Sequence, residues 1–100
     1  MRGEFTLSYH FFRQCDLRNH LELFLDIDGV SPLETWRHFT TRKSPARPLR
    51  FTAAPEHRRV YLMFAGEVSG ARGRLRILRR GKFIDNRSAQ KKRETMKVVL

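Results

Sequence analysis

The sequence contains little of what builds covalent cross-links or membrane spans. Cys15 is the only cysteine among the 100 residues, so the chain can form neither an internal disulfide nor a zinc site of several thiolates. Chains without disulfides are typical of reducing compartments, and we therefore expect a cytoplasmic protein. No apolar run is long enough for a transmembrane helix, and no signal-peptide core follows Met1, so we expect no membrane-embedded part.

Sequence patterns of several enzyme classes are also missing. The chain contains no phosphate-binding loop motif, no dinucleotide-binding glycine motif and no internal repeat. Cys15 lacks the neighbouring groups that would activate a thiolate nucleophile, so we interpret it as chemically inert. These absences argue against nucleotide-binding and cysteine-hydrolase functions.

Acidic residues are few in comparison with basic ones. The 21 lysines and arginines outnumber the 10 aspartates and glutamates, which gives a formal net charge of +11. Solubility alone needs a much smaller charge, so the excess indicates a polyanionic partner. Nucleic acid is the first candidate and an anionic membrane surface the second. A protein that is basic only because it works near the ribosome is the third.

Helical periodicity is absent over any useful length, whereas short alternating stretches recur with turn residues between them. The predicted strands lie at residues 5–12, 20–28, 33–39, 58–64, 72–78 and 95–100. Gly81 is predicted to turn the chain, and residues 40–48 and 85–94 are predicted as basic loops. The pattern predicts an all-β fold: one compact β-barrel domain over residues 1–100, with long basic loops, little helix and a missing final closing strand.

The stretch that organises the chain is residues 20–29, which alternate strictly. The leucines of this stretch and Ile27 fall on one side of an extended chain, and His20 and Glu22 fall on the other. An imidazole and a carboxylate that project the same way can share one metal ion. Such a pair is also common on solvated strand surfaces, so both interpretations stay open. Residues 33–39 are predicted to form a hairpin with this strand.

Two blocks of the sequence resemble a known family. Residues 20–26 (HLELFLD), followed by residues 28–30 (DGV), Leu33 and Trp36, are similar to the motif His-Tyr-Asp-Phe-Arg-Leu-Glu, then Asp-Gly-Val-Leu and Trp, of the 3′-phosphoesterase domain. This domain stands at the N-terminus of bacterial DNA ligase D and also occurs as a small free-standing protein. Residues 57–70 (HRRVYLMFAGEVSG) resemble its second block, in which a tyrosine follows a histidine by four residues.

The resemblance spans residues 11–83 and implies a compact β-barrel that uses a divalent ion, typically Mn²⁺, with Zn²⁺ or Co²⁺ as alternatives. It implies an enzyme of DNA repair that removes a 3′-phosphate or a 3′-terminal ribonucleoside, so that a ligase or polymerase of end joining can act. By matching position, His20 and Glu22 would bind the metal. His57 would contact the phosphate or act as a general acid, and Tyr61 would help to hold the phosphate.

The chain departs from the family pattern at three positions of the site, the first being Glu22, which stands where the family has aspartate. Gln14 stands where the family has another metal-binding histidine, and Phe24 stands where it has an arginine. His10, Arg13 and Asp16 are the nearby residues that could substitute, although none occupies a matching position. Arg50 could act as the upstream phosphate-binding arginine. Otherwise His10 and His38 are interpreted as structural.

A second basic feature is the alternation of arginine with aliphatic residues at Arg72, Arg74 and Arg76. We predict that these arginines contact nucleic acid, the alternative being a solvated sheet edge. Without the family, His57 would be a surface histidine and Tyr61 a core residue.

Three functions stay open: a metal-dependent 3′-phosphoesterase, an inactive DNA-end binding module of the same fold, and an unrelated RNA-binding barrel. The first requires the side chains of His20 and Glu22 to share a pocket with His57.

Overall fold

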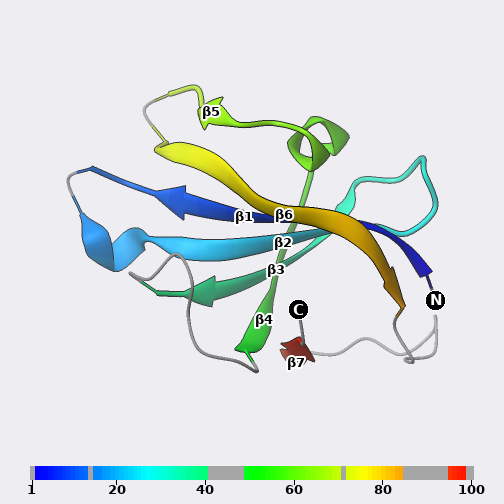
Figure 1. Cartoon of the computed structure of the whole chain (residues 1–100). Helices are drawn as coiled ribbons and strands as arrows, with labels where there is room; N and C mark the ends of the chain where they lie inside the picture. Colours follow the sequence, from blue (N-terminus) through cyan, green and yellow to red (C-terminus); the bar gives the residue numbers. More distant parts are fainter. Residues whose placement is uncertain (1, 14, 41–48, 71, 85–94, 99–100) are drawn as a thin grey trace.

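The computed structural model describes residues 2–13, 15–40, 49–70, 72–84 and 95–98. Within these residues the chain forms strands and short 3-10 helices but no α-helix (Figure 1). The strands are β1 (Arg2–Phe11), β2 (His20–Asp26), β3 (Leu33–Phe39), β4 (Leu49–His57), β5 (Gly66–Glu67), β6 (Arg74–Ile84) and β7 (Thr95–Val98). The 3-10 helices are η1 (Asp16–Arg18) and η2 (Arg59–Leu62). The predicted β-rich fold with little helix is therefore confirmed.

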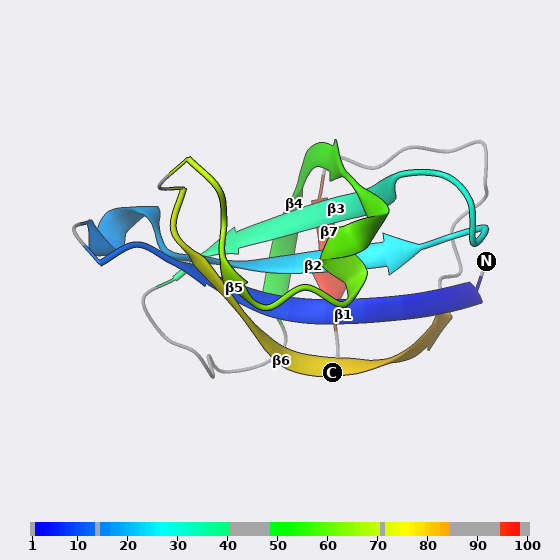
Figure 2. The ribbon, with the colours of Figure 1, turned by 90° about the horizontal axis from the view of Figure 1, so that it is seen from above.

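The strands form one antiparallel sheet of seven strands in the order β5-β6-β1-β2-β3-β4-β7. The sheet twists so strongly that β4 and β7 cross the direction of β1 and β2 at a steep angle (Figures 1 and 2). In the described part of the chain the outer strands β5 and β7 do not pair with each other, so the sheet is open. The prediction of a closed barrel is wrong here, because the two edges that would have to join are short and remain apart.

One face of the sheet carries the main core. The leucines of β2 pack there against Leu7, Tyr9, Trp36 and Phe51, all of them buried. The register explains this set, since Leu7 pairs with Leu23 and Leu23 pairs with Trp36, which places their side chains on one face. Burying a leucine of this kind stabilises the fold by about 1.5–3 kcal/mol.

The other face of β2 is buried too, although a solvent-exposed face was one of the two interpretations of the sequence. Phe24 is fully buried in a second cluster with Leu33 and Leu62. Leu62 belongs to η2, which lies over this face and is tied to it by a hydrogen bond that the hydroxyl of Thr6 donates to the Leu62 carbonyl oxygen. The interpretation of a solvated polar face on β2 is therefore wrong: His20 and Glu22 are buried, and η2 covers the part of this face around Phe24.

The strand predicted at residues 58–64 is wrong. Residues 59–62 form η2, and the strand that pairs with β3 is the preceding segment Leu49–His57. Val60 and Met63 are exposed, so the apolar run that indicated a buried strand is only partly buried. The β3–β4 ladder shifts register between Leu33 and Thr35, opposite the part of β4 that holds Pro55. Such an irregularity accommodates a residue that cannot donate a ladder hydrogen bond.

The predicted turn at Gly81 is also wrong, because β6 continues through this residue to Ile84. Gly81 faces the ring of Phe5, where an added Cβ would lie 3.0 Å from a ring carbon, so glycine fits a close approach of two strands. Of the basic loops predicted at residues 40–48 and 85–94, residues 41–48 and 85–94 lie outside the described residues. In the described part, no helix is long and apolar enough to cross a membrane.

Candidate metal centre

The pairing of β1 with β2 places three potential ligands on the face that η2 covers in part. His10 pairs with His20, and Ser8 pairs with Glu22, so both imidazoles and the carboxylate project on the same side. His10 Nδ1 lies 3.0 Å and His20 Nε2 lies 2.8 Å from the same Glu22 oxygen, Oε1. The three ligand atoms lie within 4.8 Å of one another, which is close enough for one ion to contact all of them.

The far ring nitrogens of the two histidines are already committed. His10 Nε2 lies 2.6 Å from the carbonyl oxygen of Arg72, and His20 Nδ1 lies 2.8 Å from that of Arg18. A carbonyl oxygen only accepts, so each of these nitrogens must donate its N–H. A neutral ring then presents a lone pair to Glu22 Oε1. Only a cation, either extra protons or a metal ion, relieves the repulsion between these lone pairs and the carboxylate.

Glu22 is the electrostatic centre of the cluster and is 1 % exposed. Burial raises the pKa of its carboxyl group, but the contacts with His10 and His20 and the charges of His57 and Arg37 lower it. The balance leaves this pKa well below its usual range, so Glu22 is ionised at neutral pH. A buried anion ringed by imidazole nitrogens is a suitable donor set for Mn²⁺, Zn²⁺ or Co²⁺.

His57 reaches the same carboxylate from the end of β4. Its Nε2 lies 3.4 Å from Glu22 Oε2, so His20 and His57 both contact this carboxylate, and Glu22 and His57 line one cavity. The Nδ1 atom of His57 lies 2.9 Å from the carbonyl oxygen of Pro55, to which it donates its N–H. This bond orients the ring so that Nε2 faces Glu22, in the position that a general acid would occupy.

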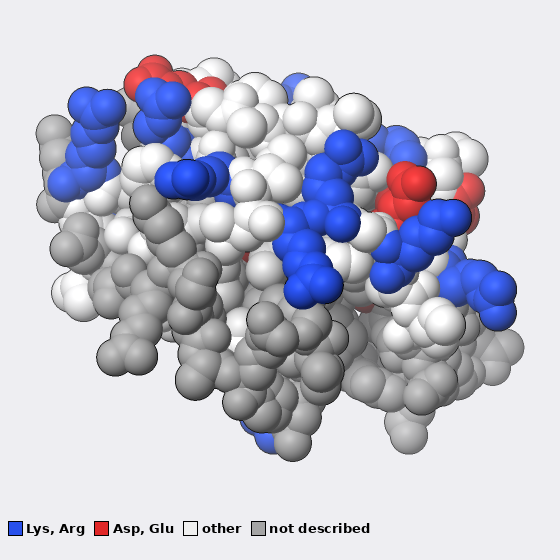
Figure 3. All heavy atoms as spheres, viewed as in Figure 1, with Lys and Arg blue, Asp and Glu red and all other residues white. Residues whose placement is uncertain are grey.

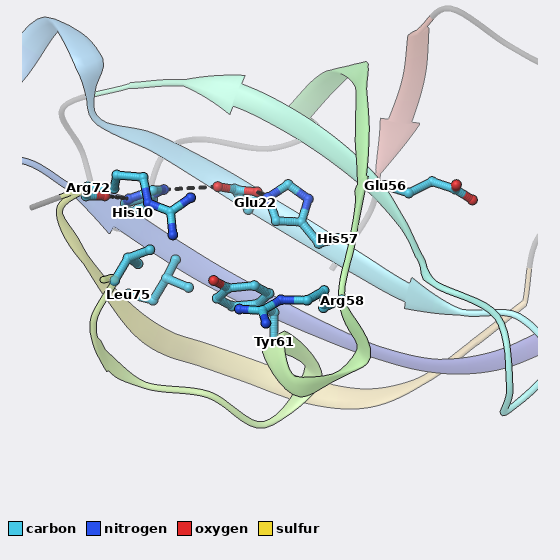
Figure 4. Close-up of a pocket in the computed structure, with 9 residues that line it drawn as sticks. His10, Glu22, Glu56, His57, Arg58, Tyr61, Arg72 and Leu75 are labelled. Atoms are coloured by element: carbon cyan, nitrogen blue, oxygen red, sulfur yellow. Dashed lines mark hydrogen bonds and ion pairs between the residues drawn. The ribbon is translucent and has the colours of Figure 1, made fainter. Parts of the chain in front are cut away.

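A cavity of about 360 Å³ opens beside Glu22 and His57 (Figure 4). Tyr61 of η2 lines it, and its ring meets that of His57 edge to face at 5.6 Å. Phe24 lies against both rings, at 5.3 Å from His57 and 6.1 Å from Tyr61. Arg58 adds a basic group to the cavity wall. Phe24 therefore packs against the rings of His57 and Tyr61 and does not offer a group that binds phosphate.

The predicted nucleic-acid-binding arginines do not all lie at this cavity. Arg72 lines it, although its guanidinium is held by Ser69, through Nε to the carbonyl oxygen at 2.6 Å and Nη2 to Oγ at 3.1 Å. Arg74 and Arg76 pair with Phe11 and Tyr9, which places both on the opposite face of the sheet.

Two further predicted arginines lie away from the cavity. Arg13 is exposed after β1, and Arg50 is exposed on β4. In Figure 3 the basic side chains spread over the visible face of the molecule and do not form one patch.

One residue of the centre was not found by sequence reasoning: Arg37, whose Nη2 lies 3.6 Å from Glu22 Oε2. His10 was named as a possible substitute for the missing family histidine and otherwise interpreted as structural, and the structure brings it to the centre. Alternation was the sequence signal that could have assigned His10 to the centre, because His10 lies opposite the apolar side of its strand, as His20 does. The pairing of His10 with His20 required the strand register. Gln14, the position matched to the missing family histidine, lies outside the described residues.

The chain matches no protein-family model, no curated protein and no solved structure. The resemblance to the 3′-phosphoesterase domain therefore stays a prediction, and the function is argued from the centre itself.

Proposed function

We propose that this chain is a cytoplasmic, divalent-metal-dependent phosphoesterase that cleans 3′ ends of DNA during repair. The observation that carries the proposal is the convergence of His10, His20 and Glu22 on one point, with His57 facing the same carboxylate at 3.4 Å. The resemblance to the 3′-phosphoesterase domain of DNA ligase D supports the substrate class. His10 supplies the second imidazole that the family pattern requires and that Gln14 does not provide.

His10, His20 and Glu22 would hold the ion. The second carboxylate oxygen of Glu22, Oε2, accepts no hydrogen bond within the described part of the chain but lies 3.4 Å from His57 Nε2 and 3.6 Å from Arg37 Nη2, so these two groups would flank an ion held there. Mn²⁺ is the expected ion, with Zn²⁺ and Co²⁺ as alternatives. A bound divalent ion neutralises phosphate charge and lowers the pKa of a coordinated water.

His57 is the residue placed to assist the leaving group. A water oxygen forms a bond to phosphorus while the bond from phosphorus to the departing ester oxygen breaks. The Nε2 proton of His57 moves to that departing oxygen, and the attacking water gives up a proton to solvent. With a 3′-phosphate the products are inorganic phosphate and a 3′-hydroxyl. With a terminal ribonucleoside, the freed nucleoside takes the proton at its 5′-oxygen. Tyr61 and Arg58 on the cavity wall hold the phosphoryl oxygens.

The second candidate is an inactive module that binds nucleic-acid ends and serves a ligase or polymerase of end joining. Phe24 favours it, because an apolar ring stands where the family carries a phosphate-binding arginine. Both candidates bind nucleic-acid ends, and a measurement of substrate turnover distinguishes them.

The test is a Mn²⁺-dependent assay on a primer-template that ends in a 3′-phosphate or a single ribonucleotide. We expect activity in the wild-type protein and a loss of at least about a hundredfold in His57→Ala and in His10→Ala, since each removes a group of the site. His38→Ala is the matched control, because His38 contacts the Arg50 carbonyl oxygen outside the centre. Absence of wild-type turnover with Mn²⁺, Zn²⁺ and Co²⁺, combined with retained DNA binding, would favour the inactive module.

A further inference from the structure

An exposed aromatic ring lies directly beside the metal centre. Phe39 pairs with His20 across β2 and β3, and the two ring centroids lie 5.2 Å apart. Phe39 is 61 % exposed, so it contributes little to either hydrophobic cluster. The exposed ring offers a flat apolar surface beside the centre on which a nucleobase can stack.

An arginine on each of two neighbouring strands accompanies this ring. Arg37 precedes Phe39 by two residues on β3 and therefore lies on the same face, where it pairs with Glu22. Its side chain is 27 % exposed, and its Nη2 lies 3.6 Å from Glu22 Oε2, so the outward side of the guanidinium is the part that a phosphate can reach. Arg50 lies on the same face of β4, two residues before Thr52, which pairs with Arg37.

We infer that Arg37, Phe39 and Arg50, here called the β3–β4 strip, bind the last nucleotides of a single-stranded DNA 3′ end. A base stacks on the ring of Phe39, and the flanking phosphates contact the guanidinium groups of Arg37 and Arg50. Aromatic rings bind bases of any sequence in this way, and arginine suits phosphate because its donors form a planar fork. The inference rests on the proposed function for the identity of the end but concerns binding alone.

Two observations favour a nucleic-acid strand as the occupant. The strip combines an aromatic ring with cations in a chain of net charge +11, which complements a polyanion and not an apolar partner surface. It also adjoins His20 and Glu22, so a strand on it would place its terminal phosphate at the centre. The occupied base must be unpaired, because a base within a duplex cannot stack on Phe39. We therefore expect single-stranded or frayed ends to bind better than blunt duplex ends.

Fluorescence anisotropy of a labelled single-stranded oligonucleotide with a 3′-hydroxyl measures this binding without turnover. Phe39→Ala is expected to weaken binding about tenfold, as loss of one stacked base does, and Phe39→Trp to retain it. Val30→Ala, which removes another exposed apolar side chain at 80 % exposure in the β2–β3 turn, is the control and should bind as the wild type. Equal affinity of Phe39→Ala and wild type, or no wild-type binding, would overturn the inference.

Salt dependence tests the two arginines. Arg37→Gln and Arg50→Gln should each lower the slope of log affinity against log salt concentration by about one, as loss of one phosphate contact does. Arg2→Gln removes the same charge from the start of β1, and its slope should stay that of the wild type. An equal change in all three variants would mean that only net charge matters, which contradicts a defined strip.

A small substrate separates this inference from the proposed function. Phe39→Ala should raise KM for the oligonucleotide 3′-phosphate by a much larger factor than KM for 4-nitrophenyl phosphate, because the small substrate carries no nucleobase that spans the strip. If no variant or wild type shows turnover but Phe39 still controls binding, the strip stands and the phosphoesterase proposal fails. If turnover is present and Phe39→Ala has no effect on oligonucleotide KM or affinity, only the strip fails.

Discussion

His10 Nδ1 lies 3.0 Å from Glu22 Oε1, a contact between residues that are 12 positions apart in the chain. The β1–β2 register creates it, because the residues of each strand that face η2 must align across the ladder. Around this contact lie the His20 imidazole and, at the cavity edge, His57, whose Nε2 is 3.4 Å from the second carboxylate oxygen of Glu22. The following predictions test whether that arrangement is a metal site and what holds it in place.

The first prediction concerns His10, which the sequence offered only as one of three possible substitutes for the family histidine. His10→Ala should reduce affinity for Mn²⁺ or Zn²⁺ at least tenfold, because it removes one of the three converging ligand atoms. Isothermal titration of the purified variants measures this affinity. His38→Ala removes a histidine from the other side of the sheet and should bind the ion as the wild type does. Equal affinity of His10→Ala and wild type would contradict the site.

The second prediction concerns the link between metal binding and stability. An ion that binds only the folded chain should stabilise it by about 2.7 kcal/mol at a free concentration of 100 times Kd. Thermal unfolding with and without Zn²⁺ measures the effect. Glu22→Gln should abolish it, because the buried anion at the centre is lost. Glu67→Gln, at an exposed position of β5, should keep the full effect. A shift of equal size in both variants would assign the ion to another place.

The third prediction concerns the glycine that lets the Arg72 carbonyl approach His10. Gly73 has φ +85, and an added Cβ would lie 2.9 Å from His10 Nε2 and 2.7 Å from the Phe11 carbonyl oxygen. Gly73→Ala should therefore weaken metal binding as well as stability. Gly29→Ala is the matched control, since Gly29 has φ +77 but nothing within 4 Å of an added Cβ. It should lose only the roughly 1–2 kcal/mol of a left-handed backbone and bind metal normally.

The fourth prediction concerns acid stability. Hydrogen bonds from the Ser31 side chain and from the backbone amides of Ser31 and Val30 lower the pKa of Asp28 from 3.8 to about 2. A carboxyl whose pKa is depressed by folding stabilises the protein above its unfolded value. That stabilisation is complete above about pH 4 and disappears as the pH falls towards 2. Urea unfolding between pH 5 and pH 2 should show a smaller loss of stability in Asp28→Asn. An identical pH dependence of variant and wild type would refute the assignment.

The fifth prediction concerns Phe24, which replaces the family arginine. Its ring is fully buried between His57, Tyr61 and the Leu33–Leu62 cluster. Phe24→Arg should destabilise the fold by about 3 kcal/mol or more, because it buries a charge and removes the packed ring. It should not create a phosphate-binding group. Chemical denaturation measures the change, and Val30→Arg at an exposed position should be nearly neutral. A stable Phe24→Arg variant with higher activity would show that the family site is restored.

Much of the fold follows from local pattern. The strict alternation of residues 20–26 fixed which leucines face the main core, and the hairpin of β2 with β3 formed as predicted at Leu33–Phe39. The error at residues 58–64 has a physical cause. An apolar run without clear periodicity is compatible with a buried strand or with a short helical turn that buries only some of its side chains. Which of the two forms depends on the segment against which the run packs. The short turn η2 packs Leu62 on Phe24 and leaves Val60 in solvent.

The sequence by itself determined the chemical types at the centre: His20 and Glu22 share a face because the strand period is two. It also placed His57 in a block similar to a known family, and the structure brings that residue to Glu22. Only the tertiary structure decided that His10 completes the cluster and that Arg74 and Arg76 lie on the far face. The reason is register, since sliding a strand by one residue moves every side chain to the other face. That choice depends on long-range packing, which no local pattern contains.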